Sequence, residues 1–267
     1  MVANKASVIN QKKSAWKYGV PISWTGLHRP MHAYKSGEGG IRPDARELSV
    51  KFVANTHGYL DMHGDVLLEG AAKKTIKERG RMAAHIHDHK FETTAEVGDV
   101  ESVYAKKLPL TTLGLNQEGV AEAVIFKSTV RRDYNESVFK RYAEGRATQH
   151  SVGIRFVHLD LAVNDKSWEE EHKNWEEYIN FVINKKDAEE LGYFWFSKEY
   201  KLLEASVVLA GANPLTGTLE VSEKSVNTDE EPAHKLVSLG GSRLVRESLS
   251  VQHPVKKIYT FPGIRKP

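Results

Sequence analysis

The stretch Thr148-Gln149-His150-Ser151-Val152-Gly153-Ile154-Arg155-Phe156 has the alternating pattern of a β-strand that begins with a serine and a glycine. In extended geometry one face carries Val152, Ile154 and Phe156, and the other carries Ser151, Gly153 and Arg155. A glycine beside a serine allows a substrate carbonyl to approach the backbone closely. Taken alone, the pattern is also typical of an ordinary buried strand. The sequence on either side of it decides whether Ser151 is a candidate nucleophile.

The composition is that of an ordinary globular protein. The chain has 267 residues, 40% hydrophobic and 27% charged, with a formal net charge of +3. This predicts one large domain or two small ones, without the dense positive charge of a dedicated nucleic-acid-binding protein. The absence of cysteine excludes disulfides, zinc–thiolate sites and a cysteine nucleophile. No apolar run approaches the ~20 residues of a membrane span, and Met1–Trp16 lacks the apolar core of a secretory signal. We therefore expect a cytoplasmic protein with no membrane partner and no specific nucleic-acid partner.

The chain divides by pattern into three parts. Residues 1–46 are rich in Lys, Gly, Ser, His and Pro and predict a loosely ordered N-terminal arm, while residues 222–267 are polar and patternless and predict a mobile tail. The central part, 47–221, alternates strands with a few helices. Strands are expected at 47–56, 81–89, 95–107, 110–126, 148–156 and 201–209, and helices at 66–79 (capped by Asp65), 134–144 (capped by Asp133) and within an inserted element at 165–196. The predicted fold is α+β and β-rich: a mostly antiparallel, closed or nearly closed β-barrel surrounded by helices.

Three of the expected strands each carry one acid–base group on a polar face, namely His87, Ser151 and Glu204. Amide hydrolysis by a serine requires a base for the hydroxyl proton and a third group that orients the base. The histidines of the 81–89 strand permit a second interpretation. If that strand is extended, His85, His87 and His89 share one face, and alternate histidines can supply two ligands to one metal ion.

Four stretches occur in a characteristic order: Asp61-Met62-His63-Gly64-Asp65-Val66 with Gly70-Ala71, His87-Asp88 with Ala95-Glu96-Val97-Gly98, His150-Ser151-Val152-Gly153-Ile154, and Leu203-Glu204-Ala205-Ser206-Val207-Val208 with Ala212-Asn213-Pro214. Together they resemble the prohead (capsid maturation) serine proteases of tailed phages, which are related to the herpesvirus assemblin proteases. The resemblance covers residues 47–215 and implies an assemblin-like barrel. The segment at 165–196 is longer than in that family, and the N-terminal arm has no counterpart in it.

Carried over by position, the resemblance implies that Ser151 is the nucleophile, His87 the general base and Glu204 the third member. The herpesvirus relatives use a second histidine as third member, so His85 and His89 are alternatives for that role. The oxyanion donors are not fixed by the motifs, and the backbone N–H of Val152 and the side chain of Arg155 are the candidates. No cofactor and no metal are implied.

The resemblance also implies a function. We expect a serine endopeptidase that cleaves scaffold protein, the major capsid protein and itself during prohead maturation, inside the immature capsid in the host cytoplasm, with a homodimer as a candidate assembly. One alternative is a catalytically inactive capsid-interior protein of the same fold, with a structural or binding role. A second is a metal-dependent hydrolase that uses His85, His87, Asp88 and His89, although the serine and glutamate motifs would then be coincidental.

Overall fold

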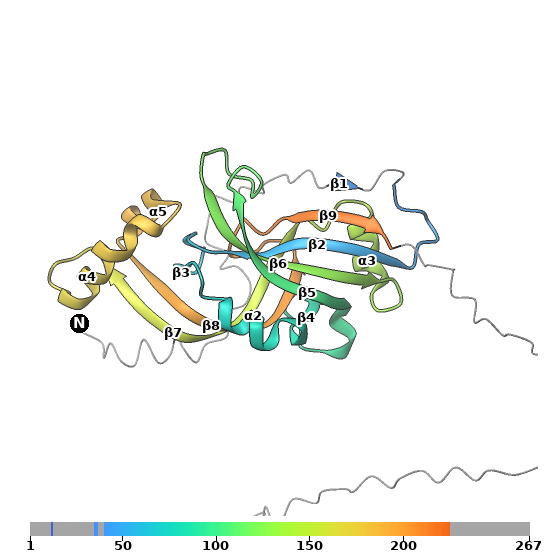
Figure 1. Cartoon of the computed structure of the whole chain (residues 1–267), viewed down its shortest axis with the longest axis horizontal. Coiled ribbons are helices and arrows are strands. Elements are labelled where there is room, and N and C mark those ends of the chain that lie inside the picture. The colour runs from blue at the N-terminus through green and yellow to red at the C-terminus, as the bar shows by residue number, and fades with distance from the viewer. Residues whose placement is uncertain (1–11, 13–34, 37–39, 225–267) are drawn as a thin grey trace, which may run out of the picture. The chain divides into compact units, whose positions relative to one another are not determined.

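The computed structural model describes residue 12, residues 35–36 and residues 40–224 of the chain (Figure 1). The chain divides into two units, Met1–Ser225 and Val226–Pro267, and every described residue belongs to the first. The predicted arm and tail therefore lie largely outside the described residues. No helix among those described is long and apolar enough to cross a membrane.

The described part is α+β and is built on one nine-stranded mixed sheet. The strand path is β1-β9-β2-β6-β5-β4-β8-β3, and β7 pairs with β8. The strands are β1 (Lys35–Ser36), β2 (Glu47–Thr56), β3 (Asp65–Leu67), β4 (Ala84–His87), β5 (Glu96–Pro109), β6 (Val120–Arg131), β7 (Gln149–Val163), β8 (Tyr193–Val208) and β9 (Thr218–Glu223). The pairs β1–β9, β3–β8 and β4–β8 are parallel, and the other pairs are antiparallel.

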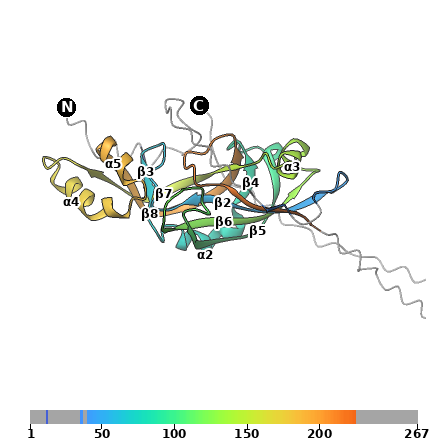
Figure 2. The same ribbon diagram turned by 90° about the horizontal axis from the view of Figure 1, so that it is seen from above.

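The expectation of a closed or nearly closed barrel surrounded by helices is corrected in two respects. First, the sheet is open, because the β-pairing between β7 and the segment before β9 is limited to an isolated bridge between Gln149 and Gly217. Second, the helices are few, and Figures 1 and 2 show α4 and α5 at the outer end of the β7–β8 hairpin, with α3 near the opposite end of the sheet. The helices are α2 (Lys73–Arg79), α3 (Glu136–Ala143), α4 (Glu169–Tyr178) and α5 (Lys185–Leu191), with short 3₁₀ turns at Gly80–Met82, Thr93–Ala95 and Ile179–Phe181.

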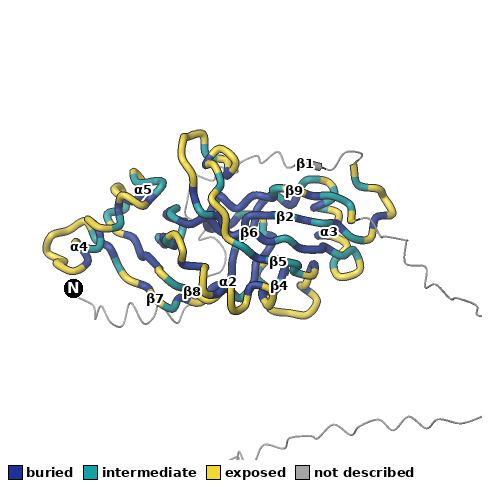
Figure 3. The backbone as a smooth tube through the Cα atoms, in the orientation of Figure 1, coloured by how far each residue is buried: buried dark blue, intermediate teal, exposed yellow. Residues whose placement is uncertain are grey.

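The main core lies between the strands and α3. In β2 the alternation seen in the sequence buries Leu48, Val50 and Phe52 completely. They pack with core-facing side chains of β7 and β8, among them Val152 and Ala205. Figure 3 shows the buried backbone concentrated in the strands, whereas much of α4 and α5 is exposed. The strands that carry the candidate site are therefore held rigidly from their core side.

Several boundaries differ from those predicted. Asp65 does not cap a helix: Asp65–Leu67 forms β3, parallel to β8, because Val66 and Leu67 are both buried and need a paired backbone. The helix begins at Lys73 instead. The cap of α3 is Asn135, whose side chain accepts a hydrogen bond from the backbone N–H of Val138 at 3.0 Å. Strand β8 begins eight residues earlier than predicted, and β9 was not predicted at all.

Candidate active site

The candidate site lies across β7, β8 and β4, with β8 in the middle. In the β7–β8 ladder Ser151 lies opposite Ser206, and Gly153 lies opposite Glu204. Side chains directly opposite one another in a sheet project from the same face, so Ser151, Ser206 and Glu204 share a face. In the β4–β8 ladder His87 is in register with Val207, which belongs to the hydrophobic core. His87 and Ser151 therefore project from opposite faces of the sheet.

The side chain that reaches Ser151's face from this part of the chain is His89. Strand β4 ends at His87, and Asp88 and His89 then adopt left-handed conformations with φ of 52° and 54°. The alternation of an extended strand therefore does not continue to His89. Its backbone N–H donates to Ser206 Oγ at 3.0 Å, and its Nδ1 lies 2.7 Å from Glu204 Oε1. The expectation that His85, His87 and His89 share one face is wrong, because the turn reverses the direction of the last of them.

Glu204 is fully buried and has both carboxylate oxygens engaged. Oε1 faces His89 Nδ1, and Oε2 accepts a hydrogen bond from Ser206 Oγ at 2.6 Å. A buried carboxylate that accepts from Nδ1–H fixes the neutral imidazole in the tautomer whose Nε2 has no hydrogen. This is the tautomer that a general base for a serine hydroxyl requires.

Gly153 explains how the carboxylate reaches β7. A Cβ built on Gly153 would overlap Glu204 Oε1 and would lie 3.0 Å from Glu204 Cδ and Cγ. The carboxylate of Glu204 thus occupies the space above Gly153, two residues along β7 from Ser151. The glycine of the Ser-Val-Gly sequence makes room for the third member of the site, which is a more specific role than close approach of a substrate.

The other two histidines lie in different surroundings. His87 Nδ1 is 3.0 Å from Asp88 Oδ2, and both residues line a hollow of about 730 Å³ beside α3. His85 is fully buried, with Nδ1 2.9 Å from Ser128 Oγ and Nε2 3.1 Å from Tyr142 Oη. Burial, and secondly the nearby imidazole of His150, hold the pKa of His85 well below its usual value. Neither ring lies beside Glu204.

The metal-hydrolase alternative requires ligands from His85, His87, Asp88 and His89 to converge on one ion. Within the described part of the chain, no group of three or more His, Cys, Asp or Glu side chains is placed to hold a metal ion. His85, His87 and His89 contact Ser128, Asp88 and Glu204 respectively and do not converge. The geometry therefore gives this alternative no ligand set.

The two oxyanion candidates differ in placement. His150 N–H donates to Thr216 O at 3.0 Å, across the edge of β7 that faces away from β8. Backbone N–H groups of alternate residues in a strand point the same way, so the N–H of Val152 also points to that edge, directly after the nucleophile. Arg155 is exposed and lies opposite Lys201 in the ladder. The position of the Val152 N–H suits an oxyanion donor. The oxyanion role remains a prediction for Val152 and for Arg155.

A chain of buried polar side chains lies on the core side of β7, and polar residues at core positions were its only sign in the sequence. Tyr142 Oη lies 2.8 Å from His150 Nε2, and His150 Nδ1 donates to Thr216 O at 3.0 Å. Burial raises the pKa of Tyr142 well above its usual value, so the phenol stays protonated. The chain ties α3 and the segment before β9 to the residue that precedes Ser151.

A second histidine–carboxylate pair lies elsewhere, at the end of β2. His57 Nδ1 is 2.7 Å from Glu122 Oε1, and this hydrogen bond is the largest cause of the lowered pKa of Glu122. The other ring nitrogen of His57, Nε2, is 3.1 Å from Tyr200 Oη. Because both nitrogens are occupied by protein groups, this imidazole is not placed to accept a proton from a substrate or nucleophile.

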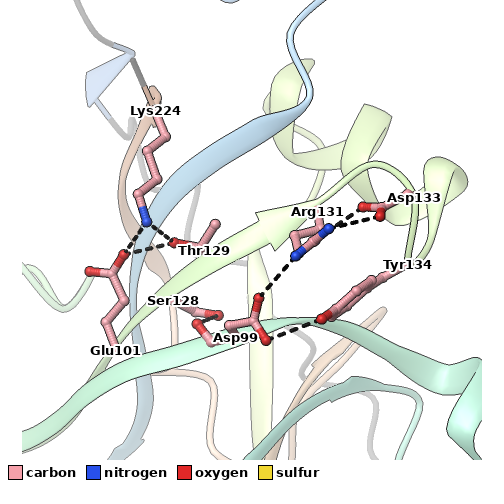
Figure 4. A network of polar contacts seen from close by, with 8 residues as sticks. All are labelled: Asp99, Glu101, Ser128, Thr129, Arg131, Asp133, Tyr134 and Lys224. Carbon is pink, nitrogen blue, oxygen red and sulfur yellow. Dashed lines mark hydrogen bonds and ion pairs between the residues drawn. The ribbon is translucent and has the colours of Figure 1, made fainter. Parts of the chain in front are cut away.

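A third polar group, on the outer side of β5 and β6, is a surface network (Figure 4). Glu101 accepts hydrogen bonds from Thr129 Oγ1 at 2.7 Å and Lys224 Nζ at 2.9 Å, and it pairs with Lys127 Nζ at 2.7 Å. These contacts, with that from Lys127 the largest, lower the pKa of Glu101 to about 2. The network joins β5 and β6 to Lys224, directly after β9, and includes none of the site residues.

Comparison with protein-family models, with curated proteins and with solved structures found no match for this chain.

Proposed function

We propose that the protein is a serine endopeptidase in which Ser151 is the nucleophile, His89 the general base and Glu204 the carboxylate that orients it. The observation that carries the proposal is the buried contact of 2.7 Å between Glu204 Oε1 and His89 Nδ1, with the carboxylate lying over Gly153. The base assigned from sequence, His87, is replaced by His89, because His87 is in register with Val207 on the core face.

In the mechanism we propose, the hydrogen bond between Glu204 and His89 orients the base toward the face that carries Ser151. His89 Nε2 accepts the hydroxyl proton as Ser151 Oγ attacks the substrate carbonyl, and the ionised Glu204 stabilises the imidazolium that forms. The N–H of Val152 donates to the oxyanion of the tetrahedral intermediate. The imidazolium then protonates the leaving amine, and a water molecule, activated by His89, hydrolyses the acyl ester on Ser151.

The substrate class rests on the resemblance of residues 47–215 to tailed-phage prohead proteases. Its motifs meet in the structure: the His-Asp motif leads into the turn at Asp88–His89, while the serine and glutamate motifs lie side by side on β7 and β8. We propose that the open sheet corresponds to the assemblin-like fold and that the enzyme acts inside the immature capsid in the host cytoplasm. Its substrates would be scaffold protein, the major capsid protein and its own ends, and a homodimer is the proposed assembly.

A fluorophosphonate probe tests the reaction type. The native protein should be labelled, the Ser151→Ala variant should not, and peptide mass spectrometry should locate the phosphonyl group on Ser151. Mass spectrometry of the intact proteins tests self-processing: the active protein should lose residues from the segments 1–46 or 222–267, and Ser151→Ala should keep its full length. An unlabelled native protein with ends identical to those of the variant would favour the non-catalytic capsid-interior protein.

A further inference from the structure

Ser206 stands between the groups of the proposed active site. It lies opposite Ser151 in the β7–β8 ladder and opposite Ile86 in the β4–β8 ladder. Its side chain is fully buried and bonds to two of the three proposed catalytic residues: His89 N–H donates to Ser206 Oγ at 3.0 Å, and Ser206 Oγ donates to Glu204 Oε2 at 2.6 Å.

The direction of these hydrogen bonds is fixed. A backbone N–H can only donate, so the Ser206 oxygen accepts from His89 and its single hydrogen is free for Glu204. The acceptor is a carboxylate oxygen, and hydrogen bonds from a hydroxyl to an ionised carboxylate are short and strong. The polarity therefore runs from the His89 backbone, through the Ser206 hydroxyl, to the Glu204 carboxylate, which in turn accepts from the His89 ring.

The result is a closed loop that holds one histidine at two points. Ser206 holds the backbone of His89, and Glu204 holds its ring. The left-handed φ of 54° at His89 is unfavourable for a residue with a side chain, so it needs a contact of this kind to persist. Without the hydroxyl, the turn would lose its tie to β8, and the buried carboxylate would lose one of its two donors.

We propose that Ser206 is a positioning residue that sets the orientation and tautomer of His89 through the His89 backbone and the Glu204 carboxylate. This inference rests on the proposed function. It assigns a role to the buried serine of the Glu-Ala-Ser sequence, which is not itself one of the three proposed catalytic residues. The role predicts that Ser206 can be removed without unfolding the strand but not without disturbing the imidazole.

The test compares two matched variants of β8, Ser206→Ala and Ser197→Ala. Ser197 is equally buried on the same strand, but its hydroxyl contacts the backbone oxygens of His158 and Glu199, away from the site. Ser206→Ala should lower the rate of fluorophosphonate labelling about tenfold to a hundredfold, the range expected for a lost hydrogen bond to a charged group. Ser197→Ala should leave the rate within about twofold, and Ser206→Thr, which keeps the hydroxyl, should restore most of it.

Nitrogen-15 NMR of the imidazoles gives a readout that does not depend on activity. In the native protein His89 should carry its hydrogen on Nδ1, and in Ser206→Ala a substantial fraction should move to the Nε2–H tautomer. Unchanged labelling and an unchanged His89 spectrum in Ser206→Ala would overturn the inference. If the native protein is not labelled but the tautomer still shifts in Ser206→Ala, the proposed function fails while the positioning role stands.

Discussion

Replacing Gly153 by alanine should displace the Glu204 carboxylate while leaving every catalytic group in the protein. The change adds one methyl group to β7 and removes no functional group. That methyl would overlap Glu204 Oε1 and lie 3.0 Å from Cδ and Cγ, so the carboxylate must move. Restoring an ordinary contact requires a shift of about 1 Å, and misplacement of a catalytic group by that distance costs roughly a hundredfold in rate. The contact of 2.7 Å between Oε1 and His89 Nδ1 cannot survive such a shift unchanged.

The assay is the rate of fluorophosphonate labelling, measured together with thermal unfolding. Gly153→Ala should be labelled roughly a hundred times more slowly than the native protein and should lose about 1–3 kcal/mol of stability through overpacking. Gly80→Ala is the matched control, because its added methyl would meet Val103 Cβ at 3.3 Å and nothing in the site. A folded Gly153→Ala that is labelled as fast as Gly80→Ala would refute the placement of the carboxylate over the glycine.

Three further changes give equally definite expectations. His89→Ala should slow fluorophosphonate labelling by about a hundredfold or more, whereas His87→Ala should change it by less than about threefold; the reverse order would restore the assignment made from sequence. The hydrogen bonds from Lys127, Thr129 and Lys224 lower the pKa of Glu101 from its usual 4.5 to about 2, so its stabilising effect should be complete above about pH 4.5 and should vanish as the pH falls through 2. Urea unfolding of Glu101→Gln against pH checks this, and a stability difference that persists at pH 2 would contradict it. Tyr142→Phe removes the hydroxyl that contacts both His85 Nε2 and His150 Nε2. The free energy of unfolding, measured in urea, should fall by about 1–3 kcal/mol. A change below about 0.5 kcal/mol would show that these buried hydrogen bonds contribute little to stability.

The parts of the fold that local pattern controls could be predicted from the sequence. Leu48, Val50 and Phe52 alternate and are buried in β2, and the strand character of the segment around Ser151 is confirmed. What could not be predicted was the pairing. Nothing local indicates that Asp65–Leu67 joins β8 in parallel, because that strand depends on partners more than a hundred residues away.

The candidate site, too, could be predicted from the sequence only in part. Ser151 and Glu204 lie on neighbouring strands of one face, as the motifs suggested. The histidine contact differs from the prediction: extended geometry was expected from Arg81 through His89, but the left-handed turn at Asp88–His89 brings His89, and not His87, to Glu204. Two consecutive non-glycine residues with positive φ are rare, so the turn was not expected, although aspartate and histidine are both enriched in this conformation.

The proposed activity depends on Ser151 as a nucleophile activated by His89 and Glu204. Its most direct test is fluorophosphonate labelling of native protein, Ser151→Ala, His89→Ala and Glu204→Gln, with the modified residue located by peptide mass spectrometry. We expect modification at Ser151 in the native protein, none in Ser151→Ala, and strongly slowed labelling in the other two variants. Modification at another residue, or labelling of Ser151 at the native rate without His89 and without Glu204, would contradict it.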